Sequence, residues 1–276
     1  MEKIKQALDR ARQEKLGHAP ASEAESESDD TSVATDGDVH SISYSETRVF
    51  SVDKETLREN GLIVGSGEHP SAETGYKILR TQVEQRLSAR GWNAFAITSP
   101  GAGVGKTTTA INLSMALAQE MHRTVLLVDL DFRNPSVHKR LGIEIEHGLI
   151  DYLISDVPLT SILVNPCIDR LVILPAGKSA IPNSSELLAS PKMIQLVEEL
   201  KSRYPSRLIV FDLPPLLWSD DMLAFSPFVD TTLLVVADGM TTREELRRVT
   251  EIMGEGELMG TVLNRSTEIQ PSYYYK

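Results

Sequence analysis

The sequence lacks three features that would place it outside a reducing cytoplasm or within a bilayer. It has one cysteine, Cys167, so no disulfide can form within the chain, which fits a reducing compartment. No apolar run approaches the ~20 residues that a membrane-spanning helix needs. Residues 1–12 alternate in charge and lack the apolar centre of a signal peptide. We therefore expect a cytoplasmic protein that reaches a membrane only through a partner.

Basic residues are also in short supply. The chain has 28 Lys and Arg against 39 Asp and Glu, a formal net charge of −11. A nucleic-acid backbone would be repelled by this overall field, so we expect no nucleic-acid partner. The 276 residues include 41% hydrophobic residues, which is enough to bury the core of one or two domains.

Composition divides the chain into three parts. Residues 1–47 are predicted to hold a charged helix and then a disordered acidic linker, since Val33 is the only large aliphatic residue between 19 and 38. Such a stretch cannot offset its ordering entropy by burial. Residues 48–265 are predicted to form the folded domain, and residues 266–276 a flexible tail that carries tyrosines.

Apolar runs alternate with helical patterns through the predicted domain. A first helix is expected over 71–90, where Tyr76, Leu79, Val83 and Leu87 recur at steps of three and four. Continuous apolar runs, typical of strands covered on both faces, lie at 94–98, 125–129, 171–174, 208–212, 232–236 and 261–264. Helices are expected at 106–119, 191–203 and 243–253. This order predicts an α/β fold with a doubly wound, mostly parallel sheet flanked by helices.

A glycine-rich loop joins the first of these strands to the next helix. Residues 98–109 read Thr-Ser-Pro-Gly-Ala-Gly-Val-Gly-Lys-Thr-Thr-Thr, with Pro100 where the strict pattern has its first glycine. Glycines let successive N–H groups point at phosphate oxygens, and the helix adds its positive end. Lys106 can reach the outer phosphates, and the Thr107 hydroxyl can ligate magnesium. We predict binding of ATP with Mg²⁺ by a loop made of Gly101, Ala102, Gly103, Val104, Gly105, Lys106, Thr107 and Thr108.

Two predicted strands end in carboxylates. Asp129 and Asp131 follow one apolar run, and Asp212 ends another. Ligands of such sheets lie at the carboxyl ends of the strands, and a carboxylate there is costly to bury without a cation. We predict that Thr107, Asp129 and Asp212 hold the metal. Lys106, Asp129 and Asp131 are the predicted catalytic residues, with one of the two aspartates accepting a proton from the attacking hydroxyl.

These motifs carry a resemblance to a known family. The loop is joined by Val-Asp-Leu-Asp-Phe-Arg-Asn-Pro-Ser at 128–136, Leu-Pro-Ala-Gly at 174–177, Asn-Ser-Ser-Glu-Leu-Leu-Ala-Ser-Pro at 183–191 and Phe-Asp-Leu-Pro-Pro at 211–215. Over about 52–264 the chain resembles the bacterial tyrosine kinases of exopolysaccharide and capsule synthesis, and among them the exosortase-associated autokinases. These belong to the deviant phosphate-loop ATPases, so the resemblance implies the phosphate-loop NTPase fold.

The resemblance also implies a function. It implies ATP-dependent tyrosine autophosphorylation that regulates exopolysaccharide synthesis or export, with Tyr273, Tyr274 and Tyr275 as acceptors and Asn264 as the residue that meets adenine. It further implies a transmembrane chain-length regulator as activating partner, a peripheral place at the inner membrane, and self-association. The family's assembly helix carries Glu, Arg and Arg at steps of three; the places read Thr74, Lys77 and Arg80 here.

Two other functions stay open at this point. The first is an ATPase switch without kinase activity, like the proteins that position septa and plasmids. That branch carries a lysine where this chain has Gly101, which disfavours the switch. The second is a nonenzymatic, ATP-binding regulatory subunit of a polysaccharide export complex, which the presence of Lys106, Asp129 and Asp212 disfavours.

Overall fold

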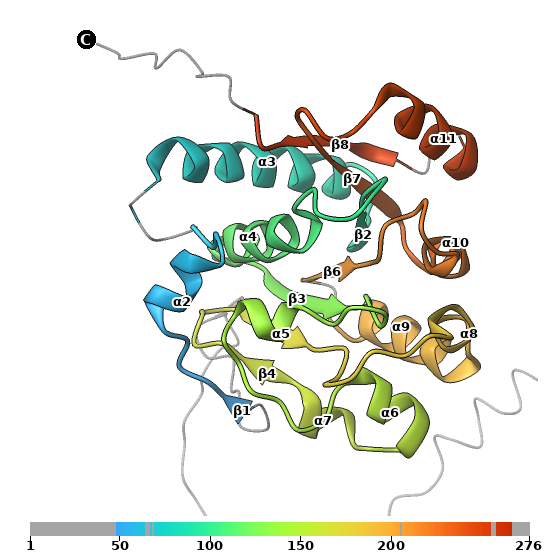
Figure 1. The fold of residues 1–276 in the computed structure, drawn as a ribbon. Helices are drawn as coiled ribbons and strands as arrows, with labels where there is room; N and C mark the ends of the chain where they lie inside the picture. The colour runs from blue at the N-terminus through green and yellow to red at the C-terminus, as the bar shows by residue number, and fades with distance from the viewer. Residues whose placement is uncertain (1–47, 64–66, 68, 205, 255–257, 267–276) are drawn as a thin grey trace, which may run out of the picture. The chain divides into compact units, whose positions relative to one another are not determined.

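A computed structural model describes residues 48–266 of the protein, apart from 64–66, 68, 205 and 255–257 (Figure 1). The charged helix and acidic linker predicted over 1–47 lie outside the described residues. So does the tail with Tyr273, Tyr274 and Tyr275. The predicted boundaries of these segments therefore stay predictions.

Strands and helices alternate along the described chain. In order they are β1 (Arg48–Val49), α2 (Lys54–Glu59), α3 (Pro70–Ser88), β2 (Ala94–Thr98), α4 (Lys106–Ala118), β3 (Thr124–Asp129), α5 (Val137–Arg140), α6 (Leu149–Ser155), α7 (Leu159–Ile162), β4 (Val164–Asn165), β5 (Leu171–Leu174), α8 (Ser184–Leu188), α9 (Pro191–Arg203), β6 (Arg207–Asp212), α10 (Asp221–Phe225), the 3₁₀ turn η1 (Ser226–Phe228), β7 (Thr231–Ala237), α11 (Arg243–Met253) and β8 (Leu258–Asn264).

The described strands form one sheet in the order β1-β4-β5-β3-β6-β2-β7-β8. All neighbours are parallel except β4 and β5, which pair antiparallel at Val164 and Ile173. The predicted fold class, a doubly wound and mostly parallel α/β sheet, is confirmed. Each long predicted strand and helix is present, with ends within about three residues of the prediction. The two-residue strands β1 and β4 were not predicted, because no periodic pattern fits in so short a run.

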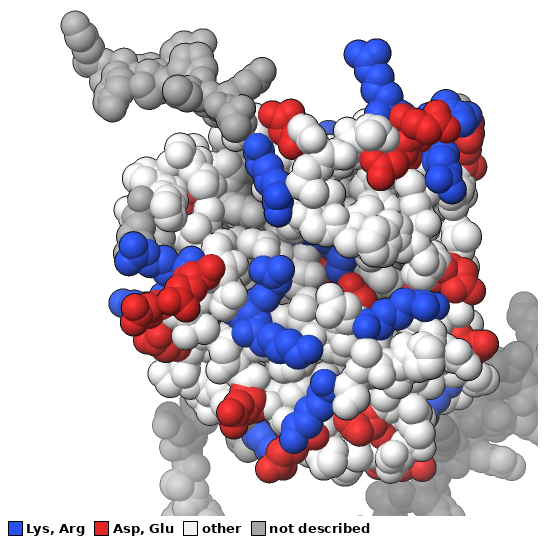
Figure 2. Space-filling view, viewed as in Figure 1, with Lys and Arg blue, Asp and Glu red and all other residues white. Residues whose placement is uncertain are grey.

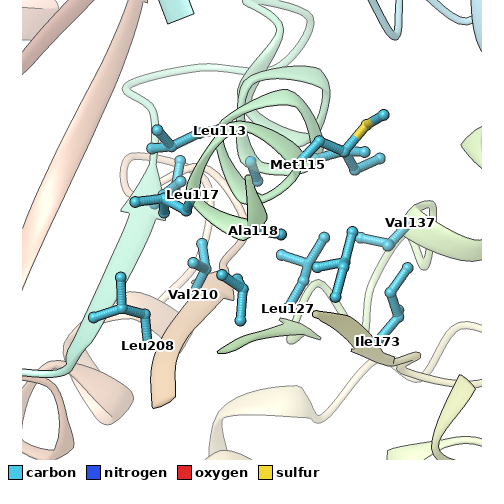
Figure 3. Close-up of a cluster of buried hydrophobic side chains, with 14 of the residues drawn as sticks. Leu113, Met115, Leu117, Ala118, Leu127, Val137, Ile173, Leu208 and Val210 are labelled. Atoms are coloured by element: carbon cyan, nitrogen blue, oxygen red, sulfur yellow. The ribbon is translucent and has the colours of Figure 1, made fainter. Parts of the chain in front are cut away.

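Side chains alternate between the two faces of the sheet and build a core on each. Phe95 and Ile97 of β2 face the core under α3 and α4, whereas Ala94 and Ala96 face the core under α9 and α11. Figure 3 shows the first core, where Leu113 and Leu117 of α4 pack with residues of β3, β5 and β6. Two buried faces explain why the strands read as unbroken apolar runs.

Helix α3 buries the face that the sequence predicts. Val83 and Leu87 are buried, and Tyr76 and Leu79 pack against the same core from partly buried positions. The helix ends at Ser88, shortly before Gly91, whose φ of 67° lies in the left-handed region. Across the part of the chain that the structure describes, no helix combines the length and apolarity needed to cross a membrane.

Candidate active site

The predicted phosphate loop lies between β2 and α4, at the carboxyl end of the sheet. It borders a cavity of about 570 Å³. Strand β6 lies beside β2, and β3 lies beside β6, so the carboxylates that end β3 and β6 meet the start of α4. The cavity is lined by Ser99, Ala102, Gly103, Gly105, Lys106, Thr107, Thr108, Asp131, Arg133, Asn134, Ser136, Arg140, Pro214, Pro215, Trp218, Ser219 and Arg265.

Residues at the end of β8 donate hydrogen bonds to the backbone of the phosphate loop. The Asn264 side-chain amide donates to the Val104 carbonyl at 2.8 Å, and Arg265 donates to the Gly103 carbonyl at 2.7 Å. Gly105 has a φ of 94°, and a Cβ built there would stand 2.1 Å from the Asn264 Nδ2. A side chain at this position is therefore opposed both by the left-handed backbone and by the contact with Asn264. The predicted contact of Asn264 with adenine stays a prediction, and its side-chain amide supports the loop.

Lys106 is held between two carboxylates. Its Nζ lies 2.9 Å from Asp212 Oδ1 and 3.2 Å from Asp131 Oδ2. The Thr107 hydroxyl donates to the other Asp212 oxygen at 2.7 Å. Lys106 is 7% exposed and Asp212 is fully buried, so this is a desolvated ion cluster rather than a surface pair. The structure thus brings four of the predicted site residues into one hydrogen-bonded group.

Burial and neighbouring charges shift the pKa values of Lys106, Asp129 and Asp212. Desolvation raises the pKa of Asp212, although Lys106 and the Thr107 hydroxyl act in the opposite direction. Desolvation and the charge of Asp212 raise the pKa of Asp129 to about 7. For Lys106, burial lowers the pKa, but the charges of Asp212 and Asp131 outweigh it and the net shift is upward. For both carboxylates, burial therefore outweighs the cationic and hydrogen-bonding partners that lower their pKa.

Asp129 lies next to this group but faces the backbone. It pairs in register with Asp212, and its Oδ2 accepts from the N–H groups of Ser136 and Val137, each at 3.0 Å. Its Oδ1 accepts from the Asp131 N–H at 3.2 Å. Asp129 is fully buried and does not line the cavity, whereas Asp131 does. Its carboxylate therefore orders the turn after β3, and its predicted metal and catalytic roles stay predictions.

The donor set fits Mg²⁺. Thr107 and Asp212 offer hard oxygen ligands side by side, and a divalent cation would offset the desolvation that raises the pKa of Asp212. Among the described residues, no group of three or more His, Cys, Asp or Glu side chains is arranged to hold a metal by itself. That is consistent with Mg²⁺, which binds one or two carboxylates and completes its shell with water and nucleotide phosphates.

One hydrogen-bonded arrangement beside the cavity was missed from the sequence. Arg133, which lines the cavity, donates from Nε to Asp221 at 2.9 Å, and the fully buried Asp221 also accepts from the Ser184 hydroxyl. Ser184 belongs to the Asn-Ser-Ser-Glu-Leu-Leu segment that the resemblance singled out, and Asp221 links this segment to Arg133 at the cavity. Ser184 and Asp221 lie 37 residues apart in sequence, so no local pattern could have predicted that they bond.

Positive side chains surround the cavity although the chain as a whole is acidic. Figure 2 shows a hollow in this face with blue side chains around it. Four basic residues line the cavity, Lys106, Arg133, Arg140 and Arg265, against the single acidic residue Asp131. This local excess favours an anionic ligand such as a nucleoside triphosphate.

Comparison with known proteins identifies the family. An AAA domain family matches residues 93–238. The tyrosine-protein kinase YwqD of Bacillus subtilis is 31% identical over 191 residues, which are 68% of this chain and 79% of that protein. The chain belongs to the bacterial tyrosine-protein kinases. The tyrosine-protein kinase Wzc of Salmonella typhi is 30% identical over 206 residues; these are 72% of the kinase chain described here but only 28% of Wzc.

Solved structures agree with this assignment. The kinase domain of the Escherichia coli tyrosine kinase ETK is 28% identical, with a TM-score of 0.66, and the match covers 78% of this kinase and 84% of that domain. The septum site-determining protein MinD of Pyrococcus horikoshii, solved with Mg-ADP, is 27% identical but more distant in structure, with a TM-score of 0.51. That match covers 63% of this kinase and 71% of MinD. The family carries a nucleotide-binding phosphate loop, which the kinase shares.

Proposed function

We propose that this kinase transfers the terminal phosphoryl group of ATP, with Mg²⁺, to tyrosines of its own chain at 273–275. The observation that carries this proposal is the buried cluster in which Lys106 bonds Asp131 and Asp212, and from which Lys106 and Asp131 line the cavity. Phosphoryl transfer needs positioning and charge neutralisation more than covalent chemistry, and this cluster supplies both.

The proposed step assigns one role to each residue. The phenolic oxygen of the acceptor bonds the terminal phosphorus, the bond from that phosphorus to the β,γ-bridging oxygen breaks, and ADP leaves. Lys106 turns from the carboxylates to the phosphate oxygens. Thr107 and Asp212 would hold Mg²⁺, which when bound neutralises charge on the phosphates. Asp131 takes the phenolic proton; we choose it over Asp129 because Asp131 lines the cavity and Asp129 faces three backbone N–H groups.

The setting of the reaction is part of the proposal. The matched region is only 28% of Wzc, so that longer relative holds further segments outside the match. We place the present kinase in exopolysaccharide synthesis or export, at the inner membrane, where a separate transmembrane chain-length regulator supplies the activating segment. We also propose self-association, but not through Arg80 of α3, because Arg80 pairs with Glu120 of its own chain at 3.0 Å.

One incubation separates the kinase from its alternatives. The full chain is incubated with ATP and Mg²⁺, and both released phosphate and sites of phosphotyrosine are measured, the latter by mass spectrometry. A Lys106→Met variant serves as the inactive control. In a second variant, Tyr273, Tyr274 and Tyr275 are all replaced by phenylalanine, with Tyr204→Phe, an exposed tyrosine of the described surface, as the matched control.

The outcomes are distinct. Phosphotyrosine on 273–275 that is lost in Lys106→Met and in the triple variant, but kept in Tyr204→Phe, supports the proposal. Phosphate release without phosphotyrosine identifies an ATPase switch. ATP binding with neither product identifies a nonenzymatic regulatory subunit. Modification confined to Tyr44, Tyr76, Tyr152 or Tyr204 overturns the assignment of the acceptors.

A further inference from the structure

An exposed tryptophan stands at the cavity. Trp218 is 71% exposed, the highest value among the large hydrophobic side chains of the described residues. It lines the same cavity as Lys106, Thr107 and Asp131. Single exposed hydrophobic side chains are common on protein surfaces, but this indole lines the cavity that also holds Lys106 and Asp131. Its position in that cavity makes it available to a bound reactant.

The backbone around Trp218 is fixed to the phosphate loop. After β6, the Leu216 N–H donates to the Ser99 carbonyl at 2.8 Å, and the Trp218 N–H donates to the Pro215 carbonyl at 3.1 Å. The Thr98 hydroxyl donates to the Pro214 carbonyl at 2.7 Å. These bonds hold the turn against the loop. The backbone that carries the indole is therefore fixed relative to the phosphate loop, which favours a residue that orients a reactant.

The indole also lies beside the start of the loop. A Cβ built on Gly101 would stand 3.8 Å from the Trp218 Nε1. Pro214 and Pro215 line the cavity next to it, so this wall is apolar, while Arg133, Arg140 and Arg265 are also part of the lining. One cavity thus combines an apolar wall with cations. That combination suits an aromatic side chain next to a phosphate group.

A bound nucleotide does not account for the apolar part of the cavity at Pro214, Pro215 and Trp218. Its phosphates need N–H groups and cations, which the loop and Lys106 provide. Asn264, the predicted adenine contact, does not line this cavity. It lines a separate one of about 250 Å³ with Tyr76 and Leu79 of α3. The base is therefore expected away from Trp218, which leaves the indole for the second substrate.

We propose that Trp218 forms the acceptor subsite, where its indole packs against the phenol ring of the incoming tyrosine. The occupant is a tyrosine of the segment 273–275, from the same chain or from a second copy. This inference rests on the proposed kinase function. It adds the group that selects an aromatic acceptor over serine and threonine hydroxyls, since only a phenol ring buries enough apolar area to cover the indole.

Two measurements test the subsite, one of them independent of catalysis. The background chain carries phenylalanine at 273–275, so that its own tail supplies no phenol, and the added acceptor is the peptide Ser-Tyr-Tyr-Tyr-Lys. Steady-state kinetics then give KM and kcat for the peptide in Trp218→Ala and Trp218→Phe. Ile154→Ala, which truncates a 63% exposed side chain of α6, is the matched control. Calorimetry with ADP measures the nucleotide Kd of each variant.

The binding measurement uses the fluorescence of Trp218. The chain has two tryptophans, so Trp92→Phe leaves Trp218 as the sole reporter. We expect the peptide to change its emission, and a peptide with alanines in place of the tyrosines to leave it unchanged. We expect Trp218→Ala to raise KM for the peptide about tenfold, Trp218→Phe to recover most of the loss, and Ile154→Ala to match the parent. The Kd for ADP stays within about twofold in all variants.

The results also separate this inference from the proposed function. An unchanged KM in Trp218→Ala, or emission that does not respond to the tyrosine peptide, overturns the acceptor subsite even if the enzyme is a tyrosine kinase. If the unmodified chain forms no phosphotyrosine, the proposed function fails, and the fluorescence titration still decides whether Trp218 binds a phenol.

Discussion

Replacing Lys106 by methionine tests whether the ligand-free chain depends on the buried ion cluster. Methionine keeps the length of the side chain but removes the charge that Asp212 and Asp131 contact at 2.9 and 3.2 Å. Asp212 is fully buried, so its charge is left uncompensated. Breaking a buried pair in this way costs about 3–5 kcal/mol of unfolding free energy. For a domain of this size we expect a Tm lower by roughly 6–20 °C.

The loss of stability in Lys106→Met should increase with pH. Burial raises the pKa of Asp212 and the charge of Lys106 lowers it, so removing Lys106 raises the pKa of Asp212 further. The folded variant then holds a proton that the unfolded chain releases. Stability falls with rising pH wherever the folded state binds more protons. The deficit of Lys106→Met should therefore be small near pH 5 and grow as the pH rises to 8.

Urea unfolding followed by circular dichroism at both pH values measures this effect. Lys178→Met is the matched control, because Lys178 is exposed and the described residues give it no ion pair. In the double variant Lys106→Met, Asp212→Asn, the uncompensated charge is gone, so part of the stability at pH 8 should return while tyrosine phosphorylation stays lost. Equal stability of Lys106→Met and the parent at pH 8 would refute the reasoning, because Lys106 would then contribute nothing to the ligand-free fold.

Three further predictions concern the surroundings of the cluster. Because the pKa of Asp129 is raised to about 7, the protein should lose stability as the pH rises from about 4 to about 7. Asp129→Asn should flatten this dependence of Tm on pH in thermal melts. An unchanged dependence would show that Asp129 is not its cause. Ser184→Ala removes a hydrogen bond to the buried Asp221 and should lower the free energy of unfolding in urea by ~1–3 kcal/mol. A decrease below roughly 0.5 kcal/mol, as for an ordinary surface substitution, argues against a structural role. Gly105→Ala should weaken ADP binding, measured by calorimetry, by roughly tenfold or more, because the left-handed backbone and the contact with Asn264 both oppose a Cβ. Adding Asn264→Ala should recover only part of the lost affinity. Full recovery would assign the whole effect to the contact with Asn264.

Local patterns in the sequence were sufficient for the elements and for the loop. A strand buried on both faces must be apolar throughout, so β2, β3 and β6 were visible as runs. A loop that wraps phosphates needs glycines and a lysine at fixed spacing, so 98–109 could be assigned without any tertiary information. These features are properties of neighbouring residues, and neighbours in sequence are what a pattern records.

The strand order, and with it the composition of the site, was decided only by the tertiary structure. Asp212 lies 106 residues from Lys106 in sequence, and they meet because β6 inserts between β2 and β3. Every crossover in a parallel sheet has a similar local pattern, so the sequence does not state which strands become neighbours. The same is true of Arg133 and Asp221, and of the exposed indole of Trp218 against the loop. The sequence thus determined which residues are chemically able to act, and the packing of the sheet determined which of them stand together.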